Sequence, residues 1–399
     1  MVLKPVLNGA LFRQFFKSEA SGGSILLACT VVSLLIANSE FAPGYLAFWK
    51  HPVGPYTTEL WINDGLMAIF FLLIGLELVR EIYVGELSDF KVALLPTIAA
   101  LGGVLVPASI HFAFNAGTET VAGMGIPMAT DIAFAIGIMS LLGRRIPIGL
   151  KIFLTALAVI DDLMAIIVIA VFYTDDLHLS SLGIALGLFA VLLLFNRLGI
   201  RHLAFYLIPG IAMWHFMHES GVHATIAGVL LAFTIPFGDG KPGTPSYELQ
   251  RFLHKPVAFF ILPVFALCNT AIPLPEGWLD DLNSNNSHGI MLGLFVGKPM
   301  GIVLFSFVAV TAGLCALPSG VNWKLLFGAG ALAGIGFTMS IFITLLAFSD
   351  PHLVDASKMS IILASSASAI LGLTWLRFTT KAPPAPARMR QRPLTEKVS

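Results

Sequence analysis

The sequence is poor in charged residues. Only 12% of its 399 residues are Asp, Glu, Lys or Arg, whereas 57% are hydrophobic and the mean hydropathy is +0.87. A soluble protein of this length needs more polar surface, so the composition excludes an ordinary soluble domain. The formal net charge is zero, which gives no basic surface for nucleic acid. The three cysteines all fall in apolar runs and form neither a disulfide framework nor a soft-metal site.

Long apolar runs take the place of the missing charge. A helix of about 20 apolar residues crosses the hydrocarbon core of a membrane, and runs of about this length recur along the chain. Alternating ten-residue strands, which would indicate a transmembrane β-barrel, do not occur. We therefore predict an all-α polytopic membrane protein with about twelve transmembrane helices. The expected spans are residues 12–36, 59–84, 92–114, 121–142, 148–174, 180–195, 203–217, 222–236, 252–271, 289–312, 325–348 and 357–379.

The basic residues predict the orientation of these spans. With the N-terminus in the cytoplasm, all but three of the 23 Lys and Arg residues fall on the cytoplasmic side. Lys50 and Lys358 fall outside, and Lys298 lies in the middle of a span. We predict one transmembrane domain over residues 1–380 with both termini cytoplasmic. The tail, residues 381–399, is rich in Pro and Arg, which favours disorder.

A few ionisable residues interrupt the apolar runs. A charged side chain at the centre of a membrane helix costs about 2.5–3.5 kcal/mol on insertion scales, so such residues are functional candidates. They are Asp131, Asp161, Asp162 and Lys298, with Asp64, Glu77 and Glu81 along the second span.

Two of these acids are adjacent in "ALAVIDDLMAIIVIAV". Neighbouring residues of a helix point about 100° apart, so Asp161 and Asp162 do not serve one ligand shell equally. Lys298 is the one basic residue in mid-membrane, and an Asp–Lys pair is the economical use of one aspartate. A purely structural ion pair explains that much, but not the second aspartate, which has a purpose if it exchanges a proton or holds a cation.

The oxygen ligands near these acids suit hard cations. Asp162, Asp131 and Thr130 offer carboxylate and hydroxyl oxygens, and no Cys or His ligand lies nearby in the sequence. The prediction is therefore a Na⁺ or Li⁺ site on Asp162 and Asp161, without any cofactor.

Two apolar stretches are interrupted in a similar way. "MGIPMATDIAFAIG" contains Pro127, and "LAGIGFTMSIFIT" contains Gly336, Thr338 and Met339. Paired broken helices indicate an ion site at the membrane midplane. Asp131 would offset the positive N-terminal ends of the half-helices, and Lys298 the negative C-terminal ends. The alternative is that glycine only permits close helix packing.

Several motifs together resemble the NhaA-type sodium/proton antiporter family. They are "FFLLIGLELVREI", "GIPMATDIAFA", "LAVIDDLMAI", "GVHATIAGVLLA", "ILPVFALCNT" and "GIGFTMSIFI", and the resemblance covers about residues 5–380. It implies an NhaA-like fold in a bacterial inner membrane. That fold has two inverted repeats, residues 92–174 and 289–379, whose discontinuous helices cross.

The resemblance also implies roles for individual residues. Asp162 takes the main cation and proton site, and Asp161 pairs with Lys298. Thr130 and Asp131 lie at the crossing, opposite Gly336 to Met339. The implied pH-response residues are Glu77, Glu81 and His223, with Gln250 at a place where the family usually has glutamate and Glu248 two residues away. Taken without the resemblance, Glu77 and Glu81 are a solvated helix end, and His223 is an ordinary polar residue.

The predicted function is electrogenic antiport that exports Na⁺ or Li⁺ and imports about two H⁺, for sodium and pH homeostasis. An intramembrane aspartic protease would need two aspartates from different helices, and a cation channel would need a symmetric pore ring. We predict no enzyme activity. The expected partners are Na⁺, Li⁺, H⁺ and membrane lipids. The resemblance favours a homodimer joined through an external β-hairpin at residues 43–57; a plain aromatic interfacial loop is the alternative.

Overall fold

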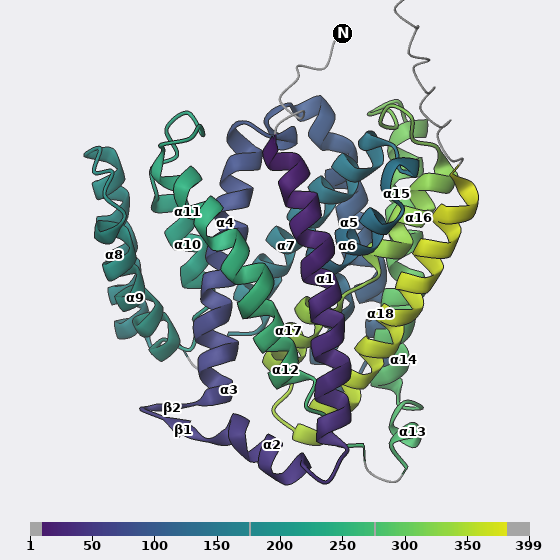
Figure 1. Ribbon diagram of the computed structural model, residues 1–399, viewed down its shortest axis with the longest axis horizontal. Helices are drawn as coiled ribbons and strands as arrows, with labels where there is room; N and C mark the ends of the chain where they lie inside the picture. Colours follow the sequence, from purple (N-terminus) through teal and green to yellow (C-terminus); the bar gives the residue numbers. More distant parts are fainter. Residues whose placement is uncertain (1–9, 175–176, 275–276, 381–399) are drawn as a thin grey trace, which may run out of the picture.

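The computed structural model describes residues 10–174, 177–274 and 277–380, and these residues are almost entirely helical (Figure 1). Seven continuous helices are long and apolar enough to cross a membrane. They are Thr58–Tyr83 (α3 Thr58–Leu60, η2 Trp61–Leu66, α4 Met67–Tyr83), α5 (Phe90–Asn115), α7 (Ile148–Phe172), α8 (Leu179–Arg197), Pro245–Asn269 (α11 Pro245–Pro256, η6 Val257–Ile261, α12 Leu262–Asn269), Asn285–Thr311 (α14 Asn285–Leu292, η7 Gly293–Gly297, α15 Lys298–Thr311) and α18 (Pro351–Thr379). The prediction of a polytopic all-α membrane protein is confirmed.

Three bent pairs of helices could each supply one further span, which makes ten within the described residues. In the first pair, α1 (Ala10–Ala37) turns by 115° into α2 (Ala42–Lys50). The other two pairs are bent by 42° and 46° and coincide with the two interrupted stretches. They are η4 (Glu119–Met128) with α6 (Ile132–Leu141), and α16 (Trp323–Ala333) with α17 (Phe337–Ala347).

The predicted count of twelve full spans is not confirmed. The stretches at 203–217 and 222–236 form α9 (Ala204–Glu219), of 16 residues, and α10 (Ile226–Thr234), of 9 residues. Both are shorter than a helix that crosses the hydrocarbon core. Helix α10 is short because Gly221, with φ 81°, turns the chain before it and Pro236 follows it closely.

The same order of helices occurs twice. Residues 92–174 hold a long helix, a broken helix and a long helix (α5, η4 with α6, α7), and residues 289–379 repeat the order (α14 to α15, α16 with α17, α18). Helices α5 and α15 pack together closely, since a Cβ on either Gly102 or Gly301 would collide with the carbonyl of the other. This order is consistent with two repeats, and their inverted relation stays a prediction.

The segment at 43–57, which we predict to be external, differs from the predicted β-hairpin. Its first part is helix α2, which begins with Pro43 in its first turn and stacks Tyr45 edge-on against Trp49 one turn later. Only β1 (Pro52–Val53) and β2 (Tyr56–Thr57) form an antiparallel pair. The prediction was therefore wrong for residues 43–50 and right for the turn that follows.

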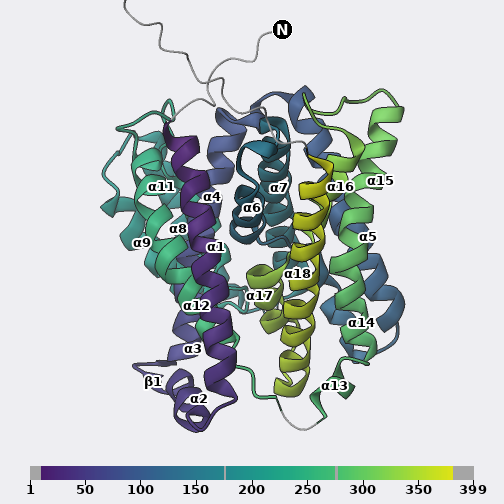
Figure 2. The same ribbon diagram turned by 45° about the vertical axis from the view of Figure 1, so that its right-hand side comes forward.

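The outer face of the bundle is apolar. Helix α8 exposes Ile184, Leu186 and Leu194, as expected for a helix surrounded by lipid. Figure 2 shows α17 inside the bundle, beside α18. Lys358, which the orientation rule placed outside, is buried in α18 with 6% of its surface exposed.

Candidate ion-binding site

The two broken helices cross at their breaks and are joined there by hydrogen bonds to backbone groups. The backbone N–H of Asp131 donates to the carbonyl of Ile335 at 2.7 Å. The Ser340 hydroxyl donates to the carbonyl of Ile126 at 2.7 Å. Gly334 lets the break between α16 and α17 lie close to η7, because a Cβ there would lie 2.5 Å from the Leu294 carbonyl oxygen. The breaks thus leave backbone groups free inside the bundle, and the opposite broken helix satisfies several of them.

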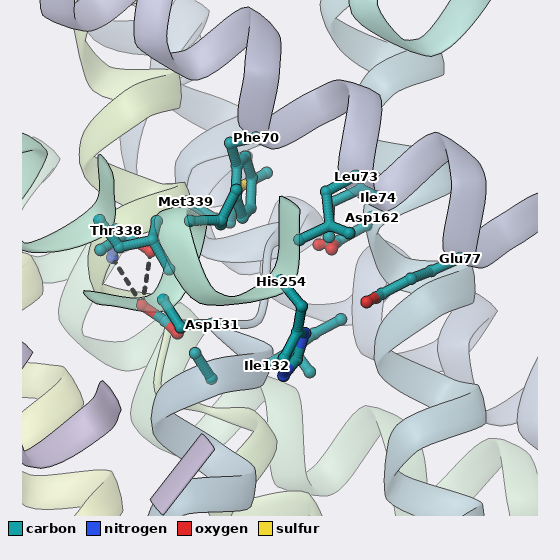
Figure 3. A pocket seen from close by; sticks show the side chains of 14 residues that line it. Phe70, Leu73, Ile74, Glu77, Asp131, Ile132, Asp162, His254, Thr338 and Met339 are labelled. Carbon is teal, nitrogen blue, oxygen red and sulfur yellow. Dashed lines mark hydrogen bonds between the residues drawn. The ribbon is translucent and has the colours of Figure 1, made fainter. Parts of the chain in front are cut away.

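Asp131 caps two half-helices at once. Its Oδ1 accepts from the backbone N–H of Phe134 at 2.9 Å, in the first turn of α6. Its Oδ2 accepts from the backbone N–H of Thr338 at 3.2 Å and from the Thr338 hydroxyl at 2.5 Å, in the first turn of α17 (Figure 3). A carboxylate between two helix N-termini offsets the positive end of both dipoles, as expected from the sequence.

Asp161 and Lys298 form a fully buried ion pair. Lys298 Nζ lies 2.7 Å from Asp161 Oδ2, and neither side chain is exposed. The lysine also donates to the carbonyl of Met128, the last residue of η4. The Thr130 hydroxyl lies 2.7 Å from the same Asp161 oxygen and 2.9 Å from the carbonyl of Ala333, the last residue of α16. One charge pair therefore links α7, α15 and both broken helices.

Asp162 has different surroundings from its neighbour. It is 1% exposed, and the Lys298 ammonium pairs with Asp161 and not with Asp162. It lines a cavity of about 40 Å³, which Asp131, Thr338, Met339, Glu77 and His254 also line (Figure 3). A cavity of this size accepts a small cation or a few waters.

The cavity separates the predicted ligands into two groups. Asp162, Asp131, Thr338 and Met339 line it, whereas Asp161, Thr130 and Lys298 form the ion pair behind it. In the part of the chain that the structure describes, no three His, Cys, Asp or Glu side chains are placed to hold a metal. A Na⁺ ion bound here would therefore need hydroxyl, carbonyl or water oxygens beside the Asp162 carboxylate.

Asp131 and Asp162 come from different helices, which is what a protease would require. Both oxygens of Asp131 are, however, acceptors for N–H and O–H donors. A protease dyad needs a proton shared between its two carboxyl groups. The capping role of Asp131 therefore speaks against that chemistry.

The predicted pH-response residues are scattered. Glu77 lines the cavity and is hydrogen-bonded to Gln250 on α11. Glu81 accepts from the backbone N–H of Glu86 at 3.0 Å, at the end of α4. Glu248 is exposed and accepts from the backbone N–H of Gly243 at 3.0 Å, so it does not take the place of Gln250 beside Glu77. His223 lies in the turn before α10 and is not among the cavity residues.

Two polar residues were missed or left unexplained by sequence reasoning. Tyr173 caps α7, and its hydroxyl is hydrogen-bonded to the backbone of η4. Gly125 and Tyr173 are 48 residues apart, and no sequence motif predicts this contact. Asp64 had been noted, and it lies near the N-terminal end of the Thr58–Tyr83 span with its Oδ2 3.3 Å from His218 Nδ1. Asp64 is not one of the residues around the Asp162 cavity.

Comparison with known proteins identifies the family of this chain. The family model described as "Na+/H+ antiporter 1" matches residues 13–376. The chain belongs to this family. It is 59% identical to "Na(+)/H(+) antiporter NhaA 1" of Flavobacterium johnsoniae, over 92% of this chain and 96% of the relative.

Two further relatives are similar over the same extent. "Na(+)/H(+) antiporter NhaA" of Cytophaga hutchinsonii is 56% identical over 94% of this chain and 96% of its own length. The protein of that name from Dechloromonas aromatica is 56% identical over 92% and 95%. The family consists of transporters and not of enzymes, so this member of the Na⁺/H⁺ antiporter family is a multi-pass membrane protein of that kind.

Proposed function

We propose that the protein exports Na⁺, or Li⁺, in exchange for H⁺, and that Asp162 holds either ion in turn. The observation that carries this proposal is the contrast between two adjacent acids. Asp161 is committed to Lys298, whereas Asp162 lies outside that ion pair and faces the cavity. A buried carboxylate without a fixed cation needs either a proton or a metal ion to neutralise it.

Competition for one carboxylate is sufficient to couple the two ions. When the site opens to the cytoplasm, Na⁺ displaces the proton from Asp162; when it opens outward, protons displace Na⁺. Alternating access would come from one bundle moving against the other around the crossing. Neither ion leaks across the membrane if the site changes sides only while Asp162 holds Na⁺ or H⁺.

The ion pair supports an exchange of two protons for one Na⁺. If Na⁺ at Asp162 breaks the Asp161–Lys298 pair, the Lys298 ammonium can release the second proton and become a neutral amine; in the alternative, Asp161 is itself protonated before Na⁺ binds and releases that proton. Two positive charges then enter for each one that leaves. One net charge moves inward per cycle, and the membrane potential contributes about 2.3 kcal/mol per 100 mV to sodium export.

The cellular setting belongs to the same proposal. Both termini would lie in the cytoplasm of a bacterium whose inner membrane holds a homodimer surrounded by lipid. The exchange would serve sodium and pH homeostasis, with Glu77, Glu81, His223, Glu248 and Gln250 as the residues to test for pH response. The family membership and the neighbours of Asp162 support this proposal.

Transport by the purified protein in lipid vesicles tests the proposal. A Na⁺ gradient should drive proton movement in the opposite direction, and Li⁺ should replace Na⁺. At zero pH gradient an inside-positive potential should accelerate Na⁺ uptake, because two protons leave as one Na⁺ enters. Proton movement that ignores Na⁺ and Li⁺ would contradict antiport, and indifference to voltage would contradict the two-for-one exchange.

A further inference from the structure

Tyr173 connects α7, the helix that carries Asp161 and Asp162, to η4 in the first broken helix. It lies at the C-terminal cap of α7 and is 7% exposed. Its hydroxyl donates to the carbonyl of Ala122 at 2.6 Å and accepts from the backbone N–H of Gly125 at 3.2 Å. One phenol thus pairs with both an acceptor and a donor of the η4 backbone.

The contact depends on a glycine. A Cβ at position 125 would lie 2.5 Å from the Tyr173 hydroxyl oxygen and 3.1 Å from its ring. Only a residue without a side chain lets the phenol reach the backbone. Because η4 is a 3₁₀ helix of ten residues, longer than such helices usually run, outside support for its backbone is physically reasonable.

The phenol is one of two attachments between the same two elements. At the other, the Thr130 hydroxyl just beyond η4 lies 2.7 Å from Asp161 Oδ2 on α7. Tyr173 follows Asp161 by twelve positions, which is about 18 Å along a helix axis. Two attachments this far apart prevent η4 from sliding or rotating on α7.

We propose that Tyr173 is a positioning residue of the ion site. Its hydroxyl sets the register of η4 on α7 and so places Thr130 and Asp131 relative to Asp161 and Asp162. This inference rests on the proposed function, since the site it aligns is the one proposed to hold Na⁺. It also implies that η4 and α7 move as one body during transport.

The test compares Tyr173→Phe with Tyr206→Phe. Tyr206 is a matched control, because it is fully buried and its hydroxyl donates to the Ile200 carbonyl at 2.8 Å, on α9 and away from the cavity. Loss of one buried hydrogen bond corresponds to a change of about five- to tenfold in an equilibrium constant. We expect Tyr173→Phe to raise the KM and the Kd for Na⁺ by about that factor, with a smaller change in kcat, and Tyr206→Phe to leave both constants at the wild-type value.

Binding of ²²Na⁺ to the detergent-purified protein supplies a readout independent of transport, and thermal unfolding shows whether both variants fold. If Tyr173→Phe does not fold, Gly125→Ala decides, since it displaces the phenol without removing it and should raise the Kd in the same way. Wild-type Na⁺ affinity in Tyr173→Phe, or in Gly125→Ala where that variant decides, would overturn the inference. An equal loss of Na⁺ affinity in the Tyr206→Phe control would overturn it as well. The proposed function fails separately, if the wild-type protein itself shows no Na⁺-dependent proton movement.

Discussion

Asp161 and Asp162 are neighbours in α7, yet only Asp161 contacts Lys298, at 2.7 Å, and only Asp162 lines the cavity. The 100° between successive helical side chains is enough to give two identical residues different environments. Asp161 is held by the Lys298 ammonium and the Thr130 hydroxyl. Asp162 is available to an exchangeable cation, Na⁺ or H⁺.

Replacing Asp162 by Asn should abolish Na⁺-dependent proton release while leaving membrane insertion and folding intact. An amide has nearly the shape of the carboxylate but neither titrates nor neutralises Na⁺. Proton release from everted vesicles after Na⁺ addition measures the effect, with Asp239→Asn on an exposed loop as the control. Normal Na⁺/H⁺ exchange by Asp162→Asn would contradict the proposal that Asp162 holds the two ions in turn.

Removing Lys298 should destabilise the fold. Truncating one partner of a buried pair costs about 3–5 kcal/mol, because the other charge is stranded. Lys298→Ala should therefore lower the melting temperature in detergent clearly more than Lys241→Ala does. Lys241 is the matched control, since it pairs with Asp239 at 3.2 Å on the surface, where such pairs contribute little. Equal melting of the two variants would contradict a paired, buried Lys298.

Neutralising both members of the pair should change the stoichiometry. Asp161→Asn combined with Lys298→Gln leaves no stranded charge and leaves Asp162 to exchange one proton for one Na⁺. Such an exchange moves no net charge, so Na⁺ uptake at zero pH gradient should become independent of an imposed potential. Continued acceleration by an inside-positive potential would show that the second proton is carried elsewhere.

The pH profile should respond to position 250. Gln250 is hydrogen-bonded to Glu77, a residue of the cavity, and cannot titrate. Gln250→Glu would place a second carboxyl group beside Glu77 and should shift activity along the pH axis. The control Glu248→Gln changes an exposed side chain on the same helix and should leave the pH profile of activity unchanged. Superimposable profiles for wild type and Gln250→Glu would exclude this position from the pH response.

Deleting residues 46–54 should give monomers that still transport. The deletion removes the end of α2 and strand β1, which together form the external segment proposed to join two copies. The ion site lies on other elements and should be unaffected. Size-exclusion chromatography in mild detergent, followed by transport in vesicles, measures both properties, and a dimer of unchanged size would refute the role of this segment.

Much of the site follows from local sequence. Pro127 and the Gly334–Gly336 stretch predict breaks, and an acid directly after the first break predicts a helix cap, which Asp131 provides. Burial of Lys298 follows from its position in an apolar run, and its distance to Asp161 bears out the expected pair.

What could not be predicted depends on segments far apart in the sequence. Whether Asp161 or Asp162 faces the cavity, and that Thr338 and Glu77 line it, follows from how four helices are rotated against each other. Helical periodicity fixes relative directions within one helix but not the rotation of the helix in the bundle. The same holds for the bond from Tyr173 to Ala122, because phenols in apolar runs are common and only the packed fold selects a partner.

The π-helical turns η2, η6 and η7 have a practical consequence for chimaeras. A π turn holds one residue more than the α-helical turn it replaces, so the helix that follows is rotated by about 100°. Residues Gly293–Gly297 directly precede Lys298, and a junction there that loses one residue would still read as a membrane helix of ordinary length. Every side chain beyond the junction would nevertheless face a different neighbour, and the lysine would turn away from its aspartate. Segments exchanged with relatives should therefore be joined outside these three turns.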